Sequence, residues 1–215
     1  LLFEAYDGRA TAGLVPSNAF GWRSLSSVSD TALDEVWNGW TPFLTSSGHD
    51  YDLFFSNDNS FVNKIPDFTA LDEYLLRWRG YTWAAEDGEY SFQLSSDDGS
   101  ILYIDDVEVV NLDGLHPRRT ASSTTWLSAG SHSIFIIFFE FRGGSIMESM
   151  WKPPGQEAWT ALSPDVLSTH DTCADFVDKS AAASVGTGLG SPINATTGVI
   201  SAPLVGHSAA EPGPV

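Results

Sequence analysis

Hydrophobic and polar residues alternate in the middle of the chain as they do in β-strands. Residues 90–94 carry Tyr, Phe and Leu at every second position, with Ser and Gln between them, so one face would be buried and the other exposed. Residues 101–104 are apolar throughout, which is typical of a strand covered on both faces. Residues 107–110 predict another short strand. Successive strands with short connections indicate a β-meander at the centre of the fold.

An acidic sequence follows the first of these strands. It reads Asp97-Asp98-Gly99, and Asp-Gly is a strong signal for a tight turn because glycine accepts a positive φ without a Cβ clash. Asp105-Asp106 then ends the second strand. We therefore expect residues 97–99 to form the tip of the meander.

Strands are also predicted on both sides of this centre. Residues 2–6 are expected to form one strand, and residues 133–139 a buried one that is apolar on both faces. Residues 146–151 predict the returning strand, and residues 159–167 are expected to close the domain.

Helices and loops account for the remaining residues of the domain. Residues 30–37 predict a short helix with Asp30 as its N-cap, because their apolar side chains fall on one face. Residues 38–70 are interpreted as loops and short strands, with residues 56–60 as a loop tip. Residues 114–125 are interpreted as a loop that carries two solvated arginines, Arg118 and Arg119.

The composition changes near residue 180. From there to residue 215 there is no aromatic side chain and one charged residue, Glu211, while small residues and proline dominate. We predict a domain over residues 1–172 and an extended, low-complexity C-terminal segment over residues 173–215. A single cysteine, Cys173, closes no disulfide within the chain.

Composition and charge exclude some classes of function. Hydrophobic residues make up 42% of the 215 positions, enough for a sizeable core, and the formal net charge of −18 argues against nucleic-acid binding. The longest apolar run, residues 134–139, is far shorter than the ~20 residues of a membrane-spanning helix. An acidic, lysine-poor, Ser/Thr/Gly-rich composition is common outside the cell. The chain starts at Leu1, which suggests that a leader was removed or that the sequence is a fragment.

Several short motifs resemble one known family, the PA-fourteen (PA14) domain of flocculins, fungal adhesins and bacterial surface proteins. The motifs keep their order and spacing over residues 75–160. They are Arg77-Trp78-x-Gly80, Gly88-x-Tyr90-x-Phe92, Ser96-Asp97-Asp98-Gly99-Ser100, Leu102-Tyr103-Ile104-Asp105, Leu127-x-Ala129-Gly130-x-His132 and Trp151-x-Pro153-Pro154-Gly155. The resemblance implies an all-β fold, an antiparallel β-sandwich or barrel.

The resemblance also implies a candidate site. In the flocculin-like lectin branch, the aspartates that match Asp97 and Asp98 are joined by a cis peptide and hold a calcium ion that bridges to sugar hydroxyls. Calcium prefers hard oxygen ligands, so the chemistry fits. That branch has an asparagine in a later loop, where this chain has Glu140 and Arg142. Glu140 is a candidate third ligand, and Arg142 is a candidate sugar contact that would also oppose a cation. Alternatively, Asp97-Asp98-Gly99 only builds a turn.

No enzyme is predicted. The sequence has no Gly-x-Ser-x-Gly elbow, no His-Glu-x-x-His motif, no Cys/His cluster and no phosphate-binding glycine loop. Its five histidines are scattered.

Two functional hypotheses remain, and both suit an extracellular or cell-surface protein. The first, which we rank slightly higher, is a structural subunit whose C-terminal segment docks on a neighbouring copy and builds a fibre or surface layer. Val199, Ile200, Leu204 and Val205 would form the docking strand, and the sequon at Asn194 would carry a glycan. The second is a calcium-dependent carbohydrate-binding adhesion module. Expected partners are therefore copies of the chain itself and glycans.

Overall fold

The computed structural model describes residues 1–7, 41–48, 51–70 and 72–170. The helix predicted at residues 30–37 lies outside these ranges, as do Cys173, Asn194 and the predicted docking strand. The domain boundary at residue 172 and the extended segment 173–215 therefore stay predictions. Among the described residues, no helix is long and apolar enough to cross a membrane.

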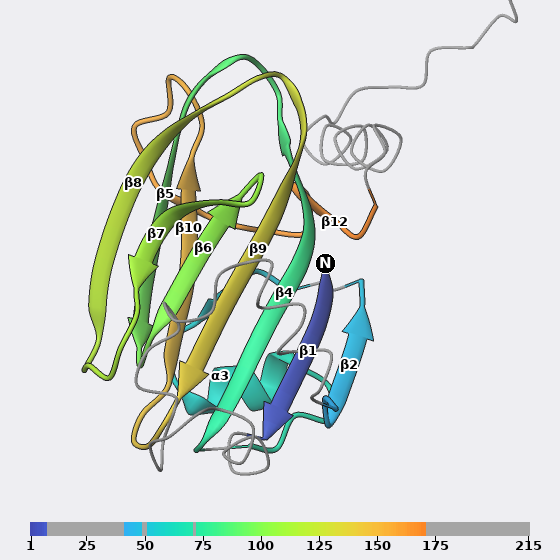
Figure 1. Cartoon of the computed structure of the whole chain (residues 1–215), viewed down its shortest axis with the longest axis vertical. Coiled ribbons are helices and arrows are strands. Elements are labelled where there is room, and N and C mark those ends of the chain that lie inside the picture. The colour runs from blue at the N-terminus through green and yellow to red at the C-terminus, as the bar shows by residue number, and fades with distance from the viewer. Residues whose placement is uncertain (8–40, 49–50, 71, 171–215) are drawn as a thin grey trace, which may run out of the picture.

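Two antiparallel sheets form the fold (Figure 1), which confirms the all-β prediction. The first sheet has the order β2-β1-β4-β9-β6-β7, with β12 also paired to β4, and the second has the order β11-β10-β5-β8, with β3 also paired to β10. The strands of the first sheet are β1 (Leu2–Asp7), β2 (Leu44–Ser47), β4 (Tyr74–Ala84), β6 (Ser100–Ile104), β7 (Val107–Leu112), β9 (Gly130–Glu140) and β12 (Leu167–Ser168). Those of the second are β3 (Phe54–Phe55), β5 (Gly88–Asp97), β8 (Arg119–Leu127), β10 (Ile146–Lys152) and β11 (Thr160–Ala161).

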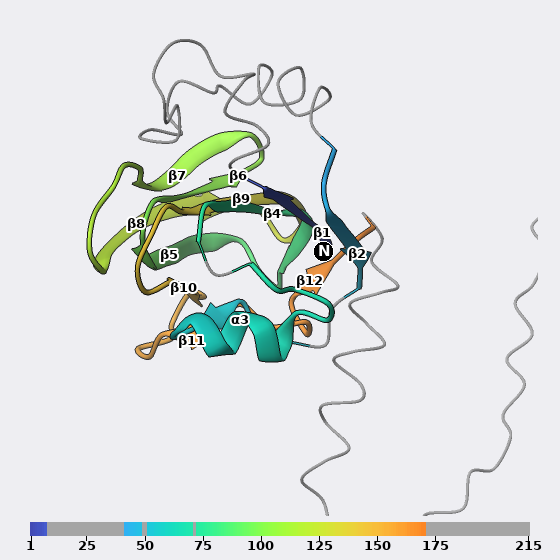
Figure 2. The same ribbon diagram turned by 90° about the horizontal axis from the view of Figure 1, so that it is seen from below.

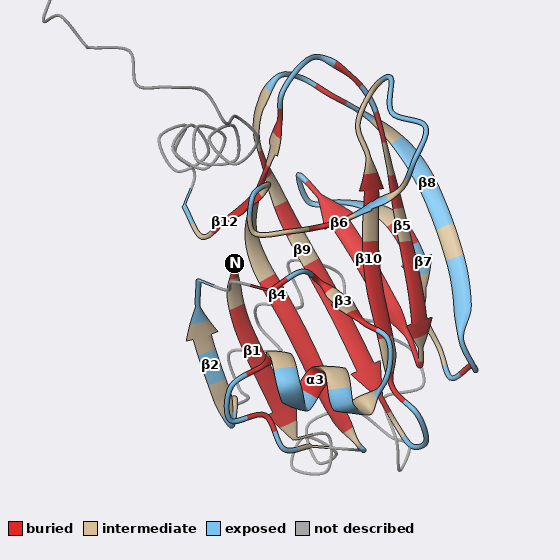
Figure 3. Ribbon diagram, turned by 180° about the vertical axis from the view of Figure 1, so that it is seen from behind, coloured by how far each residue is buried: buried red, intermediate tan, exposed pale blue. Residues whose placement is uncertain are grey.

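The two sheets stack as layers around an aromatic core (Figure 2). A helix, α3 (Asp58–Lys64), covers the inner face of the first sheet beside β10 (Figure 3). Its Phe61 is buried and stacks on Phe55 at 4.4 Å and on Phe138 of β9 at 5.6 Å between ring centroids. Phe55 also stacks on Trp78 of β4, at 5.8 Å. These rings join the helix and both sheets into one core.

The strand predictions that rest on the alternation of apolar and polar side chains are confirmed. On β5, Tyr90, Phe92 and Leu94 are fully buried in the core, as their alternation indicates. Strands also form at the predicted runs near residues 2–6, 101–104, 107–110, 133–139 and 146–151.

The β-meander prediction is wrong at residues 97–99. β5 pairs with β8 and β10, whereas β6 pairs with β7 and β9, so Asp97-Asp98-Gly99 crosses from one sheet to the other. Gly99 is not at a positive φ. A Cβ there would come within 2.3 Å of the Phe139 ring and 3.0 Å of the Gly114 backbone, so close packing, not turn geometry, requires glycine.

Two segments interpreted as loops are regular elements. Residues 56–60 contain the start of α3, because Asn57 and Ser60 form a capping box: Ser60 N donates to Asn57 Oδ1 at 3.1 Å, and Asn57 N donates to Ser60 Oγ at 3.2 Å. The segment from Arg119 onward is β8, an edge strand of the second sheet. Its exposed, β-branched threonines suit a strand whose outer face is solvated.

Replacing Asn57 by alanine tests the helix cap. Asn57→Ala removes the side-chain acceptor and should lower the free energy of unfolding by about 1 kcal/mol. Asn59→Ala is the matched control, because Asn59 is exposed within the same helix and caps nothing; it should be neutral or slightly stabilising. Chemical denaturation of both variants measures the difference. Equal stabilities would contradict the capping box.

Candidate metal centre

Three carboxylates meet at one end of the sandwich, where β5 and β9 end (Figure 1). Asp97 is the last residue of β5, Asp98 lies in the crossover that follows, and Glu140 is the last residue of β9. One oxygen of each lies within 4.8 Å of the others. The two sheets therefore both contribute to the cluster, the second through Asp97 and the first through Glu140.

Asp98 is held by two backbone donors. His116 N donates to Asp98 Oδ1 at 3.0 Å, and Phe141 N donates to Asp98 Oδ2 at 3.0 Å. The backbone N–H of Asp98 donates to Glu140 Oε2 at 3.2 Å. The Asp97–Asp98 peptide bond is cis, as the family resemblance implied. These contacts fix the Asp98 and Glu140 side chains before any ligand arrives.

The cluster carries an uncompensated negative charge. Burial raises the pKa of Glu140 to about 8, and the charges of Asp98 and Asp97 act in the same direction. Burial and the neighbouring Asp98 also raise the pKa of Asp97. The nearby arginines are engaged elsewhere: Arg118 pairs with Glu148 at 2.5 Å, and Arg142 pairs with Glu73 at 2.8 Å.

One oxygen in the cluster lacks a hydrogen-bond partner. Glu140 is 1% exposed, and its Oε1 accepts no hydrogen bond from any described residue. Leaving a buried acceptor unsatisfied costs about 1–3 kcal/mol. A cation beside Oε1 would remove this cost. It would also offset the repulsion among the three carboxylates. The residues present therefore fit a metal ion.

The donor set selects the kind of metal. All three side chains offer carboxylate oxygens, which suit hard cations such as calcium. The adjacent histidine takes no part, because the His116 ring nitrogens lie 3.0 Å from Pro117 O and 2.7 Å from Leu112 O. A soft or nitrogen-preferring metal therefore gains no ligand here from the described residues.

The structure brings together three of the predicted site residues and places the fourth apart from them. Asp97, Asp98 and Glu140 lie together, whereas Arg142 forms an ion pair with Glu73 and lies over the Phe141 ring, 5.0 Å from its centroid. No described contact brings Arg142 into the cluster.

Some contributors were missed by sequence reasoning. The backbone donors of His116 and Phe141 carry no side-chain signature. For Glu140, which was predicted from the family resemblance, the sequence also holds a local signal: a single carboxylate directly follows a six-residue apolar run and is expected to be buried with it.

Comparisons with known proteins agree with this architecture. The PA14 domain of the antifreeze protein MpAFP superimposes with a TM-score of 0.58 at 14% identity, over 80% of this chain and 93% of that chain. The PA14 sugar-binding domain from an RTX adhesin gives 0.59 at 16% identity, over 79% of this chain and 98% of that chain. The Epithelial Adhesin 9 A domain from Candida glabrata, in complex with Galb1-3GlcNAc, gives 0.52 at 13% identity, over 81% and 91%.

At these identities the structural likeness concerns the fold alone. No curated protein matches the chain. A family model described as the PA14 domain matches residues 55–162, which is half of the 215-residue sequence. It spans every strand from β4 to β11 and all three carboxylates of the cluster. This chain therefore belongs to the PA14 domain family.

Proposed function

We propose that the chain is an extracellular carbohydrate-binding adhesion module that uses calcium, held by Asp97, Asp98 and Glu140. The observation that carries this proposal is the unpartnered Glu140 Oε1 in a buried cluster of three carboxylates. The printed descriptions of two structural neighbours, a sugar-binding domain of an RTX adhesin and an adhesin domain in complex with a disaccharide, support the choice of ligand class.

The three side chains differ in exposure, so they would bind different sides of the ion. Asp98 and Glu140 are buried, so they would bind the inner side of the ion, while the partly exposed Asp97 lies toward solvent. Calcium takes about six to eight oxygen ligands, so when bound it supplies further positions that sugar hydroxyls can fill. The protein's part is to orient the carboxylates, which the backbone donors of His116 and Phe141 do for Asp98.

Binding accounts for the cluster better than catalysis does. Close carboxylates with raised pKa values are also found in the acid pairs of glycosidases. Here Glu140 is 1% exposed and Asp98 is 7% exposed, and both oxygens of Asp98 accept backbone hydrogen bonds. Neither group can reach a glycosidic oxygen in this arrangement, so we propose a non-enzymatic module.

Fibre assembly and glycosylation stay separate predictions. They depend on Asn194 and on Val199, Ile200, Leu204 and Val205, which lie outside the described residues. No observation on the described domain favours assembly over sugar binding, so the carbohydrate-binding proposal now ranks first.

Calcium should stabilise the folded protein. An ion that binds the folded state alone adds RT ln(1 + [L]/Kd), ~2.7 kcal/mol at a hundredfold excess over Kd, which raises Tm by roughly 5–10 °C in a domain of this size. Asp97→Asn should abolish the shift. Asp87→Asn, at the opposite end of β5, should retain it, because Asp87 Oδ1 only accepts from Ala129 N. Superimposable wild-type melts in calcium and in chelator would refute the proposal.

Without calcium, stability should fall as pH rises. The pKa of Glu140 is about 8 in the folded protein against an ordinary value of 4.5, so between these values the folded state binds more protons than the unfolded state. The free energy of unfolding therefore decreases as pH rises from about 4.5 to about 8. Glu140→Gln should remove this decrease. Denaturation in chelator across this range measures it, and parallel profiles for wild type and variant would contradict the assignment.

A further inference from the structure

The outer face of the second sheet carries a continuous polar strip along β5 and β8. Residues directly opposite each other in an antiparallel pair point to the same face, and successive residues alternate between faces. Tyr90, Phe92 and Leu94 of β5 face the core, so the residues between them and their partners on β8 face outward. This strip, the β5–β8 track, consists of Ser91, Gln93, Ser95, Thr120, Ser122 and Thr124.

The track begins at the candidate metal centre. Asp97, the last residue of β5, follows Ser95 by two positions, so its side chain lies on the same outer face. Trp126 lies at the other end of the track, opposite Glu89 of β5. Glu89 precedes Asp97 by eight positions. At ~3.3 Å per residue, the track is about 26 Å long. A sugar held at the ion would therefore have a surface along which further sugar rings can lie.

The track is neutral and offers hydroxyl and amide groups alone. Ser91 Oγ lies 3.0 Å from Thr124 Oγ1, and Ser95 Oγ lies 2.7 Å from Thr120 Oγ1, so two hydroxyl pairs bond across the strands. A hydroxyl has one donor and two acceptor positions, so each pair keeps hydrogen-bonding capacity for a ligand. In a chain of net charge −18, this neutral strip suits a neutral ligand, because no charged side chain of the track would lose water on binding.

An exposed indole ends the track. Trp126 is 67% exposed, more than any other large hydrophobic side chain that the structure describes. The next residue, Leu127, is buried in the core, so Trp126 faces outward with the track. Among the described strands β8 pairs with β5 alone, and its exposed residues follow the sheet edge (Figure 3). A solvated strand needs no tryptophan, whereas the C–H face of a sugar ring packs on an indole and keeps its hydroxyls free for hydrogen bonds.

A second indole lies across the same end of the track. Lys152 of β10 pairs with Ser91, so its side chain is on the outer face. Its Nζ lies over the Trp159 ring, 5.1 Å from the centroid. Trp159 therefore borders this end of the track on the β10 side, while Trp126 borders it on the β8 side.

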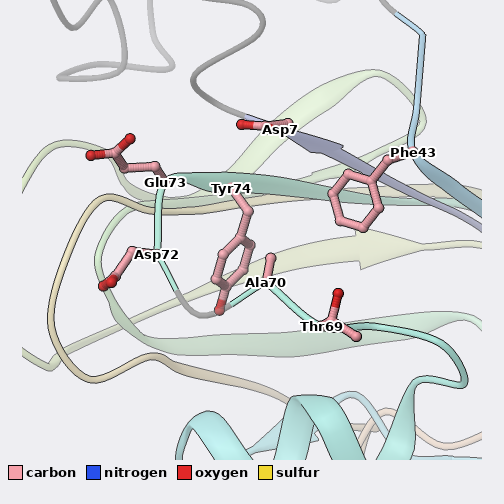
Figure 4. Close-up of a pocket in the computed structure, with 7 residues that line it drawn as sticks. All are labelled: Asp7, Phe43, Thr69, Ala70, Asp72, Glu73 and Tyr74. Carbon is pink, nitrogen blue, oxygen red and sulfur yellow. The ribbon is translucent and has the colours of Figure 1, made fainter.

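The exposed ring of Phe43 offers no comparable surface. It lines a pocket of about 270 Å³ beside the end of β1 (Figure 4), and it stacks on Phe68 at 6.1 Å between centroids. The Asp72 and Glu73 carboxylates of that lining point away from Phe43 (Figure 4), and Glu73 is paired with Arg142. An exposed ring and a row of polar groups therefore converge at the track and not in the described lining of this pocket.

We propose that the β5–β8 track binds a neutral, extended oligosaccharide, with one end at the metal centre and later sugars at Trp126. This inference rests on the proposed function and names its ligand class, a chain of several sugars in place of a single terminal sugar. A short glycan held at the ion does not reach Trp126. Affinity should therefore increase with chain length.

Calorimetric titration of the full chain in saturating calcium tests the proposal. The probes are the disaccharide and the hexasaccharide of β-linked glucose, mannose, xylose and N-acetylglucosamine. In at least one series the hexasaccharide should bind about tenfold more tightly than the disaccharide, because the longer chain alone reaches the indole.

Substitutions at Trp126 locate the gain. Trp126→Ala should remove most of it and leave the disaccharide affinity unchanged, whereas Trp126→Tyr should keep most of it because tyrosine retains an aromatic face. Val107→Ala is the matched control, since Val107 is 63% exposed on β7 and lies outside the track. It should change neither affinity. Thermal melts of the variants check that each is folded.

The outcomes separate this inference from the proposed function. Equal affinities for disaccharide and hexasaccharide, or a gain that Trp126→Ala leaves intact, would overturn the track while the proposed function stands. If no sugar binds in calcium, both fail. If hexasaccharide binding depends on Trp126 but not on calcium, the proposed calcium site fails and the track stands. Sedimentation of the sugar-free protein covers the other occupant: a dimer that Trp126→Ala dissociates would assign this face to a second copy of the chain and overturn the proposal.

Discussion

The hydrogen bonds to the Asp98 carboxylate organise the end of the molecule that carries the candidate metal centre. This one side chain accepts a backbone N–H from His116, in the connection between β7 and β8, and another from Phe141, directly after β9. It lies itself in the crossover between β5 and β6. Three connections that are far apart in sequence therefore meet on one buried carboxylate. Because a buried carboxylate needs such donors, each connection depends on the other two for its position.

The core explains how a charged cluster can persist beside apolar strands. β9 is apolar on both faces over most of its length and ends at Glu140, so the strand delivers this carboxylate to a fixed, dry position. The aromatic stack of Phe61, Phe55 and Trp78 joins the sheets beneath it. Packing energy thus holds three mutually repelling carboxylates in place, and the proposed affinity for a cation depends on this crowding.

The sequence predicted the features that follow from the alternation of side chains along one strand. It did not predict which strands or side chains distant in sequence pair with each other. The burial of Tyr90, Phe92 and Leu94 follows from alternation alone. The pairing of β6 with β9 does not follow from alternation, because β9 lies about thirty residues further along the chain. The Asp98-Gly99 sequence also resembled a hairpin turn. Likewise, the grouping of Asp97, Asp98 and Glu140 came from a family resemblance, whereas the pairing of Arg142 with Glu73 depends on how two loops meet. The helix at Asp58 was visible in principle, as an Asn-x-x-Ser cap before a buried phenylalanine.

The crossover at residues 97–99 has a mechanical consequence. Asp97 belongs to one sheet and Glu140 to the other, so an ion between them would tie the two layers together. In an adhesion module, tension on a bound glycan would then pass through the ion into both layers at once, and would spread over the hydrogen-bonded neighbours of β5 and β9. Separating the layers and releasing the ligand would become one event, so the force that such an attachment withstands would depend on calcium concentration.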